Sequence, residues 1–226
     1  MKKTVVLDVD DVLYGLNEAV EKLVVEKYPD FSFSKVHTYN FNKSLSDEEK
    51  SVAGICNTDA WDGLGAPREY IMSLYGLVKP FRESKLYDIP RLAELFIKCN
   101  VVLHTSGLSV DVCKFKLGQL NNLLDNLGVV GDVSVQLVGS MIHISVGGEK
   151  QGVVDRHFVS KPVVVCDYVV EDCLENLRGY SNCKMFLVDK PWNNPIYNSS
   201  CFDVMSKAVR VSDINKAIDI ILDEVD

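Results

Sequence analysis

The sequence contains no long hydrophobic run, no dense cluster of basic residues and no tract of low complexity. No apolar stretch approaches the roughly 18 residues that a membrane-spanning helix needs, and the few apolar residues after the opening MKK fall short of a signal-peptide core. The formal net charge is −8, whereas a surface for long nucleic acid makes many basic contacts with phosphates. We therefore expect a cytoplasmic protein that binds neither membrane nor long nucleic acid.

Cysteine is present but without pattern. The seven cysteines are scattered, odd in number, and form neither a C-x-x-C pair nor a compact Cys/His spacing. A disulfide framework or a zinc site would need such a spacing. We expect reduced cysteines that serve as small hydrophobic residues.

Short β-rich runs of nearly continuous apolar character recur along the chain. Strands with this pattern are typical of parallel sheets that are buried on both faces. Helical patterns lie between several of them, and this alternation predicts a layered α/β fold. The expected strands lie at 4–10, 101–104, within 133–146, at 163–170 and at 184–188.

Two helical patterns carry recognisable end signals. One apolar face runs from Leu117 to Leu127 and stops at Gly128, a good helix C-terminal residue. The pattern over 214–225 follows Asp213, a suitable N-cap. We expect this last helix to pack on the sheet.

Residues 16–84 interrupt the alternation of strands and helices. Helical stretches are expected near 17–27, 46–56 and 67–76, with no convincing strand among them. A chain of 226 residues has room for one domain with an insert. We predict an α/β core formed by 1–15 and 85–226 and a small helical domain at 16–84.

The stretch VVLDVDDVL (5–13) places Asp8, Asp10 and Asp11 at the end of an apolar strand. Residues two apart on a strand share a face, so Asp8 and Asp10 project together beyond the carboxyl edge of the sheet. Two close carboxylates are tolerated when a proton or a cation neutralises them, and such oxygen-rich sites suit Mg²⁺. A strand that ends in solvated aspartates and a turn is the alternative interpretation.

Several segments resemble motifs of the haloacid dehalogenase-like phosphatases. DVDDVL resembles the first motif, which assigns Asp8 as the nucleophile and Asp10 as the general acid and base. HTSGL at 104–108 resembles the second, with Thr105 and then Ser106 as phosphate-binding residues, in the TS form of the 5′(3′)-deoxyribonucleotidase branch. Without the family, Thr-Ser-Gly after a strand is ordinary turn chemistry.

A second acidic strand end resembles the family's later motifs. In SKPVVVCDYVVEDCLENL (160–177), Glu171 and Asp172 match the acidic pair that completes the metal site, and Lys161 matches the phosphate-binding lysine of the same branch. Lys150, which follows another apolar run, is a rival for that role. LVDKPWN (187–193) is similar to a turn that follows this motif in small nucleotidases, although alone it is only a Pro-initiated turn.

Two positions depart from the branch pattern. Asp11 stands where these enzymes usually have glycine, and Glu171 replaces the first aspartate of the acidic pair. The longer Glu171 side chain could exchange direct metal ligation for ligation through water. The sequence assigns no role to Asp11.

The resemblance implies a Mg²⁺-dependent phosphatase with a three-layer Rossmann-like core, and a 5′-nucleotidase acting on deoxyribonucleoside monophosphates in particular. Asp8, Asp10 through its backbone carbonyl, Glu171 and Asp172 would hold the metal. The helical insert resembles the family's cap, which reads the leaving group. Aromatic residues there and nearby are candidates for stacking on a base: Tyr14, Phe41, Trp61 and Tyr70.

Three alternatives remain open at this stage. The same chemistry could act on another phosphomonoester such as a sugar phosphate. Paired acids, a Thr/Ser and a later Lys also occur in phospho-acceptor signalling domains, although Asp59 and Asp62 lie in the insert and not at a strand end. The third alternative is a catalytically silent relative used for binding. The sequence leaves the oligomeric state open, a homodimer included.

Overall fold

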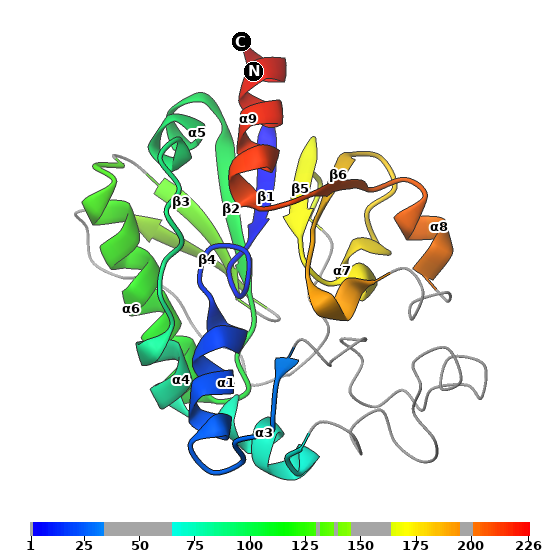
Figure 1. Cartoon of the computed structure of the whole chain (residues 1–226). Helices are drawn as coiled ribbons and strands as arrows, with labels where there is room; N and C mark the ends of the chain where they lie inside the picture. Colours follow the sequence, from blue (N-terminus) through cyan, green and yellow to red (C-terminus); the bar gives the residue numbers. More distant parts are fainter. Residues whose placement is uncertain (1, 34–64, 130–131, 138–139, 146–163, 195–200) are drawn as a thin grey trace.

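Seven strands of the computed structural model form one sheet (Figure 1). The structure describes residues 2–33, 65–129, 132–137, 140–145, 164–194 and 201–226. The strands are β1 (Thr4–Asp8), β2 (Asn100–Thr105), β3 (Asp132–Leu137), β4 (Ser140–Ser145), β5 (Tyr168–Glu171), β6 (Lys184–Val188) and β7 (Val209–Val211).

The strand order is β4-β3-β2-β1-β5-β6-β7, so the first strand lies at the centre of the sheet. All neighbouring pairs from β3 to β7 are parallel. The apolar run within 133–146 departs from this pattern, because it divides into two strands and β4 pairs with β3 in the antiparallel sense. The strand expected at 163–170 is also shorter at its start, since β5 begins at Tyr168.

Helices of varied length connect and cover the strands. In the described residues they are α1 (Leu16–Val25), α3 (Arg68–Leu74), α4 (Val78–Glu83), α5 (Leu92–Lys98), α6 (Val110–Asn126), α7 (Leu174–Leu177), α8 (Phe202–Met205), α9 (Ile214–Val225) and the short 3₁₀ turn η2 (Pro191–Asn193). Of these, α1, α3 and α4 lie between β1 and α5, where the sequence predicts the insert.

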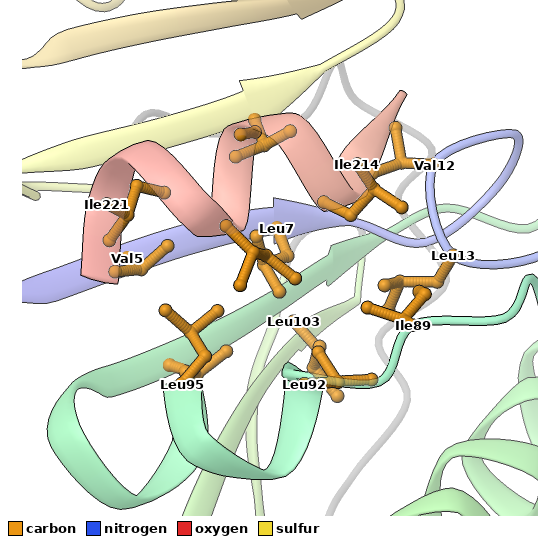
Figure 2. Packing of buried hydrophobic residues seen from close by; sticks show 14 of the residues in the cluster. Val5, Leu7, Val12, Leu13, Ile89, Leu92, Leu95, Leu103, Ile214 and Ile221 are labelled. Atoms are coloured by element: carbon orange, nitrogen blue, oxygen red, sulfur yellow. The ribbon is translucent and has the colours of Figure 1, made fainter. Parts of the chain in front are cut away.

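Alternation along β1 supplies both faces of the sheet with apolar side chains. Val5 and Leu7 point to one face, where α5, α6 and α9 pack, and Figure 2 shows Leu92, Leu95 and Ile221 closing over them. Val6 points to the opposite face, where α7 and α8 pack. The predicted three-layer α/β fold with a parallel sheet is therefore confirmed.

The two residues predicted to mark helix ends, Asp213 and Gly128, have the expected geometry. The carboxylate of Asp213 accepts a hydrogen bond of 3.0 Å from the backbone N–H of Lys216, in the first turn of α9. Gly128 follows α6 with φ of 65°, a left-handed conformation in which a side chain would be strained.

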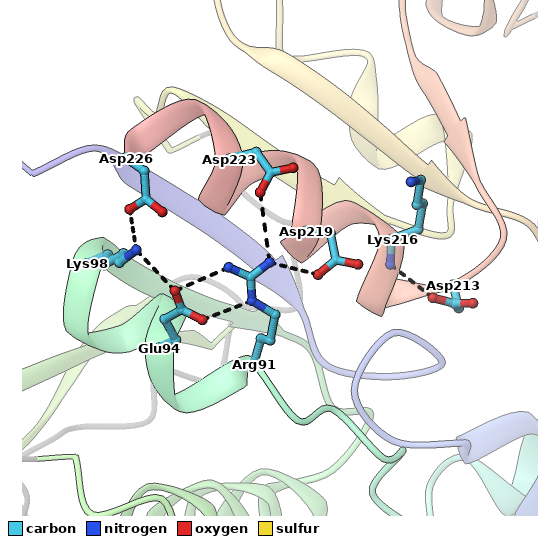
Figure 3. A network of polar contacts seen from close by, with 8 residues as sticks. All are labelled: Arg91, Glu94, Lys98, Asp213, Lys216, Asp219, Asp223 and Asp226. Atoms are coloured by element: carbon cyan, nitrogen blue, oxygen red, sulfur yellow. Dashed lines mark hydrogen bonds and ion pairs between the residues drawn. The ribbon is translucent and has the colours of Figure 1, made fainter.

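A polar network holds α9 beside α5 at their exposed surfaces (Figure 3). Arg91 donates to Glu94 at 2.9 Å and to Asp219 at 3.0 Å, and Lys98 pairs with Glu94 and Asp226. Exposed ion pairs stabilise a fold by at most about 1 kcal/mol each. The apolar contact of Figure 2 is therefore the main support of this helix pair.

The helices α1, α3 and α4 gather beyond the end of the sheet to which β1 points (Figure 1). They share an apolar cluster that includes Leu16, Val20, Ile71 and Phe81 and reaches Trp192 of η2. The predicted helix at 46–56 lies outside the described residues, so the domain bounds at 16–84 stay a prediction. No helix of the described residues is long and apolar enough to cross a membrane.

Candidate active site

Three buried carboxylates meet where β1 and β5 end. The two strands pair in parallel through Leu7 and Val170, so the next residues, Asp8 and Glu171, stand side by side at the carboxyl edge. An oxygen atom from each of Asp8, Glu171 and Asp172 lies within 4.8 Å of the others, and these residues are only 3, 1 and 2% exposed. Parallel strands thus bring together acids that are more than 160 positions apart in the sequence.

Glu171 is held by the turn that follows its strand. Its Oε2 accepts the backbone N–H groups of Asp172 at 3.0 Å and Cys173 at 3.2 Å, and its Oε1 accepts from the amide of Asn176 at 2.7 Å. Hydrogen bonds to a carboxylate offset part of the cost of burying it. The longer side chain that departs from the family pattern is therefore folded back onto its own turn.

Asp172 is positioned by the η2 turn. The indole N–H of Trp192 donates to Asp172 Oδ2 at 2.9 Å, and the amide of Asn193 donates to the Asp172 carbonyl at 2.9 Å and to the Val188 carbonyl at 2.7 Å. This arrangement connects the KPWN segment directly to the acidic site.

The donor set of this cluster fits Mg²⁺. All of its side-chain donors are carboxylate oxygens, which Mg²⁺ prefers, and a single divalent cation would neutralise charges that are otherwise costly to bury together. Asp8, Glu171 and Asp172 would hold the ion. The carboxylate of Asp10 is not part of this group, which is compatible with the expectation that Asp10 contributes only its backbone carbonyl.

A second polar cluster surrounds Asp10. The ammonium of Lys116 donates to Asp10 Oδ2, to Thr105 Oγ1 at 2.9 Å and to the backbone carbonyl of Ser106. The Thr105 hydroxyl also donates weakly to Asp10 Oδ2, at 3.4 Å. The structure thus brings together three predicted site residues, Asp10, Thr105 and Ser106, around a lysine that the motif comparison did not select.

Lys116 was missed because the family pattern directs attention to later lysines. Lys150 and Lys161 both lie outside the described residues, so their roles stay predictions. A signal for Lys116 was nevertheless present, because it falls on the stripe that α6 buries. That stripe consists of Val112, Cys113, Lys116, Leu120, Leu123 and Leu124. A lysine inside an apolar stripe is uncommon unless its charge has partners.

Tyr75, at the end of α3, is buried near the two clusters. Its hydroxyl donates to the side-chain carbonyl of Asn17. Burial raises the pKa of Tyr75 well above its usual value, and the negative charges of Asp11, Asp10 and Asp172 raise it further. Acids of both clusters therefore lie near enough to Tyr75 for their charges to affect it.

Asp11, the acid without a role in the sequence, supports the start of α1. It is the one non-glycine residue with positive φ in the described chain, at 58°, a conformation that aspartate tolerates better than most residues. Its Oδ1 accepts the backbone N–H of Asn17 at 2.9 Å, where the helix N-terminus favours negative charge. Burial raises the pKa of Asp11 to about 7, although the bond to Asn17 and the charge of Lys190 oppose the shift.

A cavity of about 220 Å³ opens beside Asp10 and Lys116. The helices α1, α3 and α4 supply most of its apolar wall, and the loop after β2 supplies the rest. Gly107 belongs to this loop, where an added Cβ would lie 2.7 Å from Cys113 Sγ. The remaining lining residues are Leu16, Met72, Tyr75, Phe81, Ser106 and Leu108.

The aromatic residues expected to stack on a ligand are placed differently from the prediction. Tyr14 is buried in the core of the sheet, and Tyr70 packs against Tyr28 with ring centroids 5.3 Å apart. Neither lines the cavity, and Phe41 and Trp61 lie outside the described residues. The aromatic wall comes instead from Tyr75 and Phe81.

Comparison with protein-family models and with curated proteins finds no match. Among solved structures, the matches include a haloacid dehalogenase-like family hydrolase from Streptococcus pneumoniae, with 9% identity and a TM-score of 0.36 over 97% of this chain and 98% of that chain. A protein assigned as a beta-phosphoglucomutase from Thermotoga maritima has 14% identity and a TM-score of 0.38 over 98 and 99% of the two chains. L-2-haloacid dehalogenase from Xanthobacter autotrophicus has 12% identity and a TM-score of 0.40 over 98% of each chain. Similarity at this level assigns neither an activity nor a substrate.

The hydrogen bond from Trp192 to Asp172 leads to a prediction about metal affinity. Trp192→Phe keeps an aromatic ring but removes the donor, and loss of a partner of a metal-binding carboxylate typically weakens metal affinity about 10- to 100-fold. We expect this loss in titration calorimetry with Mg²⁺. Phe33→Leu is the matched control. Phe33 packs edge-on against the Trp192 ring, with the centroids 6.3 Å apart, so this variant changes the packing of Trp192 but keeps its N–H donor for Asp172. Equal Mg²⁺ affinity in native protein and Trp192→Phe would refute the connection.

The raised pKa of Asp11 leads to a prediction about stability and pH. The folded state binds the Asp11 proton more tightly than the unfolded state, so its contribution is present below about pH 4 and is lost as the pH rises to about 7. Asp11→Asn keeps the acceptor oxygen and tolerates positive φ but does not ionise. In urea unfolding with EDTA, its free energy of unfolding should therefore rise relative to that of the native protein across this pH range. Parallel pH profiles for the two proteins would contradict the assignment.

Proposed function

We propose that the protein is a Mg²⁺-dependent phosphomonoester hydrolase of the haloacid dehalogenase-like type. The observation that supports this most strongly is the placement of Asp8 in a buried carboxylate cluster while Asp10, two residues later, lies in a separate cluster beside a cavity. The same sequence motif therefore supplies two carboxylates in different environments. This is the arrangement that separate nucleophilic and proton-transfer roles require.

In the first half-reaction, a carboxylate oxygen of Asp8 attacks the phosphorus atom of the substrate. The bond between phosphorus and the leaving oxygen breaks, and Asp10 donates a proton to that oxygen. The products are an alcohol and an aspartyl-phosphate on Asp8. The cavity beside Asp10 receives the alcohol.

In the second half-reaction, Asp10 accepts a proton from water as the water oxygen attacks phosphorus. The acyl-phosphate bond breaks, which restores the Asp8 carboxylate and releases inorganic phosphate. Mg²⁺ bound by Asp8, Glu171 and Asp172 would supply positive charge for the transferring oxygens and reduce their repulsion by Asp8. Thr105 and Ser106, together with Lys161 or Lys150, remain the proposed phosphate ligands.

The proposed substrate is a nucleoside monophosphate, in line with the resemblance to the 5′(3′)-deoxyribonucleotidase branch. The cavity supports this choice, because Tyr75, Phe81 and Met72 give it an apolar and partly aromatic wall. Flat bases bind well to such walls, whereas the hydroxyl groups of a sugar need polar partners. A sugar phosphate is therefore the second candidate, and a phospho-acceptor signalling domain is the candidate that lacks turnover.

Phosphate release from a panel of nucleotides and sugar phosphates, with and without Mg²⁺, tests this proposal. We expect Mg²⁺-dependent turnover, higher kcat/KM for nucleoside monophosphates, and at least a thousandfold loss in Asp8→Asn because the nucleophile is absent. Asp203→Asn, a change of an exposed acid on α8, is the control and should retain activity.

The alternatives predict other results in the same panel. Undiminished activity in Asp8→Asn would contradict the mechanism. A preference for sugar phosphates would contradict the substrate, and a stable phosphoprotein without turnover would indicate a signalling domain.

A further inference from the structure

We infer that Lys116 is a positioning residue that holds the Asp10 carboxylate in place for proton transfer, and that it does not act mainly as a phosphate ligand. This inference rests on the proposed function, because it concerns the acid and base of that reaction. Its basis is the geometry of the Lys116 ammonium, the exposure of Asp10 and the shape of the neighbouring cavity.

The first observation is that the Lys116 ammonium is fully engaged inside the protein. Lys116 is 1% exposed, and an ammonium group has three N–H donors. These go to Asp10 Oδ2, Thr105 Oγ1 and the Ser106 carbonyl. A phosphoryl oxygen could bind Lys116 only by displacing one of these three acceptors, so direct phosphate binding is not its main role.

The second observation is the asymmetry of the Asp10 carboxylate. Both hydrogen bonds that Asp10 accepts from side chains in the described part of the chain end on Oδ2, one from Lys116 and one from Thr105. The Asp10 side chain is 17% exposed and lines the cavity, in contrast to the buried Asp8, Glu171 and Asp172. Oδ2 is thus anchored, and within the described residues Oδ1 accepts no side-chain hydrogen bond, so we assign the proton exchange to Oδ1.

The third observation concerns what anchors Lys116 itself. Its ammonium lies 4.7 Å from the centroid of the Phe81 ring, within the range of a cation–π contact, and its backbone belongs to the long helix α6. Phe81 lies on α4, which contacts α6. The lysine therefore joins α6, α4 and the loop after β2 at the point where Asp10 meets the cavity.

These observations give the lysine a kinetic role. Asp10 must donate a proton to one oxygen and accept a proton from another, and misplacement by about 1 Å can cost a hundredfold in rate. Anchoring Oδ2 restricts rotation of the side chain. Removal of the anchor should slow the proton-transfer steps without removing the nucleophile.

The test uses two substrates whose leaving groups differ in basicity and therefore in their need for a proton. A nucleoside 5′-monophosphate releases a strongly basic alkoxide that needs a proton, whereas 4-nitrophenyl phosphate releases a weakly basic phenolate that does not. We expect Lys116→Met to lower kcat/KM about 100-fold for the nucleotide and less than about tenfold for the nitrophenyl ester, because kcat/KM reports the first half-reaction, in which only the nucleotide needs the Asp10 proton. The second half-reaction, in which Asp10 is the base, is common to both substrates. Asp10→Asn should show the same selectivity.

Two further variants keep the test decisive. Lys114→Met changes an exposed lysine on the same helix and should leave both rates unchanged. Lys116→Gln, which retains two N–H donors for Thr105 and Ser106, serves if the methionine variant does not fold. In either variant, an equal fall in kcat/KM for both substrates would overturn the inference in favour of a structural or a phosphate-binding role. Absence of turnover in the native protein would instead refute the proposed function, so the two failures are distinguishable.

Discussion

The cost of burying several carboxylates at one edge of a sheet is the constraint on which the candidate site depends. Each acid is accommodated in a different way. Glu171 accepts hydrogen bonds from its own turn, Asp172 from the η2 turn, and Asp10 from Lys116, while Asp11 accepts the backbone N–H of Asn17 in the first turn of α1. Asp8, Glu171 and Asp172 remain close enough to share one cation. The contacts around the site therefore serve mainly to stabilise buried carboxylates.

The parallel sheet makes this arrangement possible. Because β1 lies between β2 and β5, the residues that end these three strands meet at one edge, although they belong to distant parts of the chain. The helices α1, α3 and α4 stand over the same edge and supply the apolar wall of the cavity (Figure 1). Charge for the proposed reaction and apolar surface for the proposed ligand thus come from different layers of the fold.

Much of this could be predicted from local sequence patterns. Continuous apolar runs predicted the parallel strands, and Asp213 and Gly128 predicted helix ends. That Asp8 would meet Glu171 and Asp172 came from the resemblance to the phosphatase motifs. The hydrogen bonds that position the acidic residues were harder to predict, because they depend on tertiary contacts. The hydrogen bond from Trp192 to Asp172 spans 20 positions, and that from Lys116 to Asp10 spans 106. The one local signal, the position of Lys116 among the apolar residues of α6, was not used in the sequence analysis.

The central claim is that Asp8 carries the phosphoryl group beside a Mg²⁺ ion held by Glu171 and Asp172. A crystal structure of the protein with Mg²⁺ and beryllium fluoride, which mimics an acyl phosphate on a carboxylate, tests it most directly. We expect beryllium fluoride bonded to a carboxylate oxygen of Asp8 and Mg²⁺ in contact with the acidic cluster. Beryllium fluoride on another residue, or Mg²⁺ bound away from Asp8, Glu171 and Asp172, would contradict the claim.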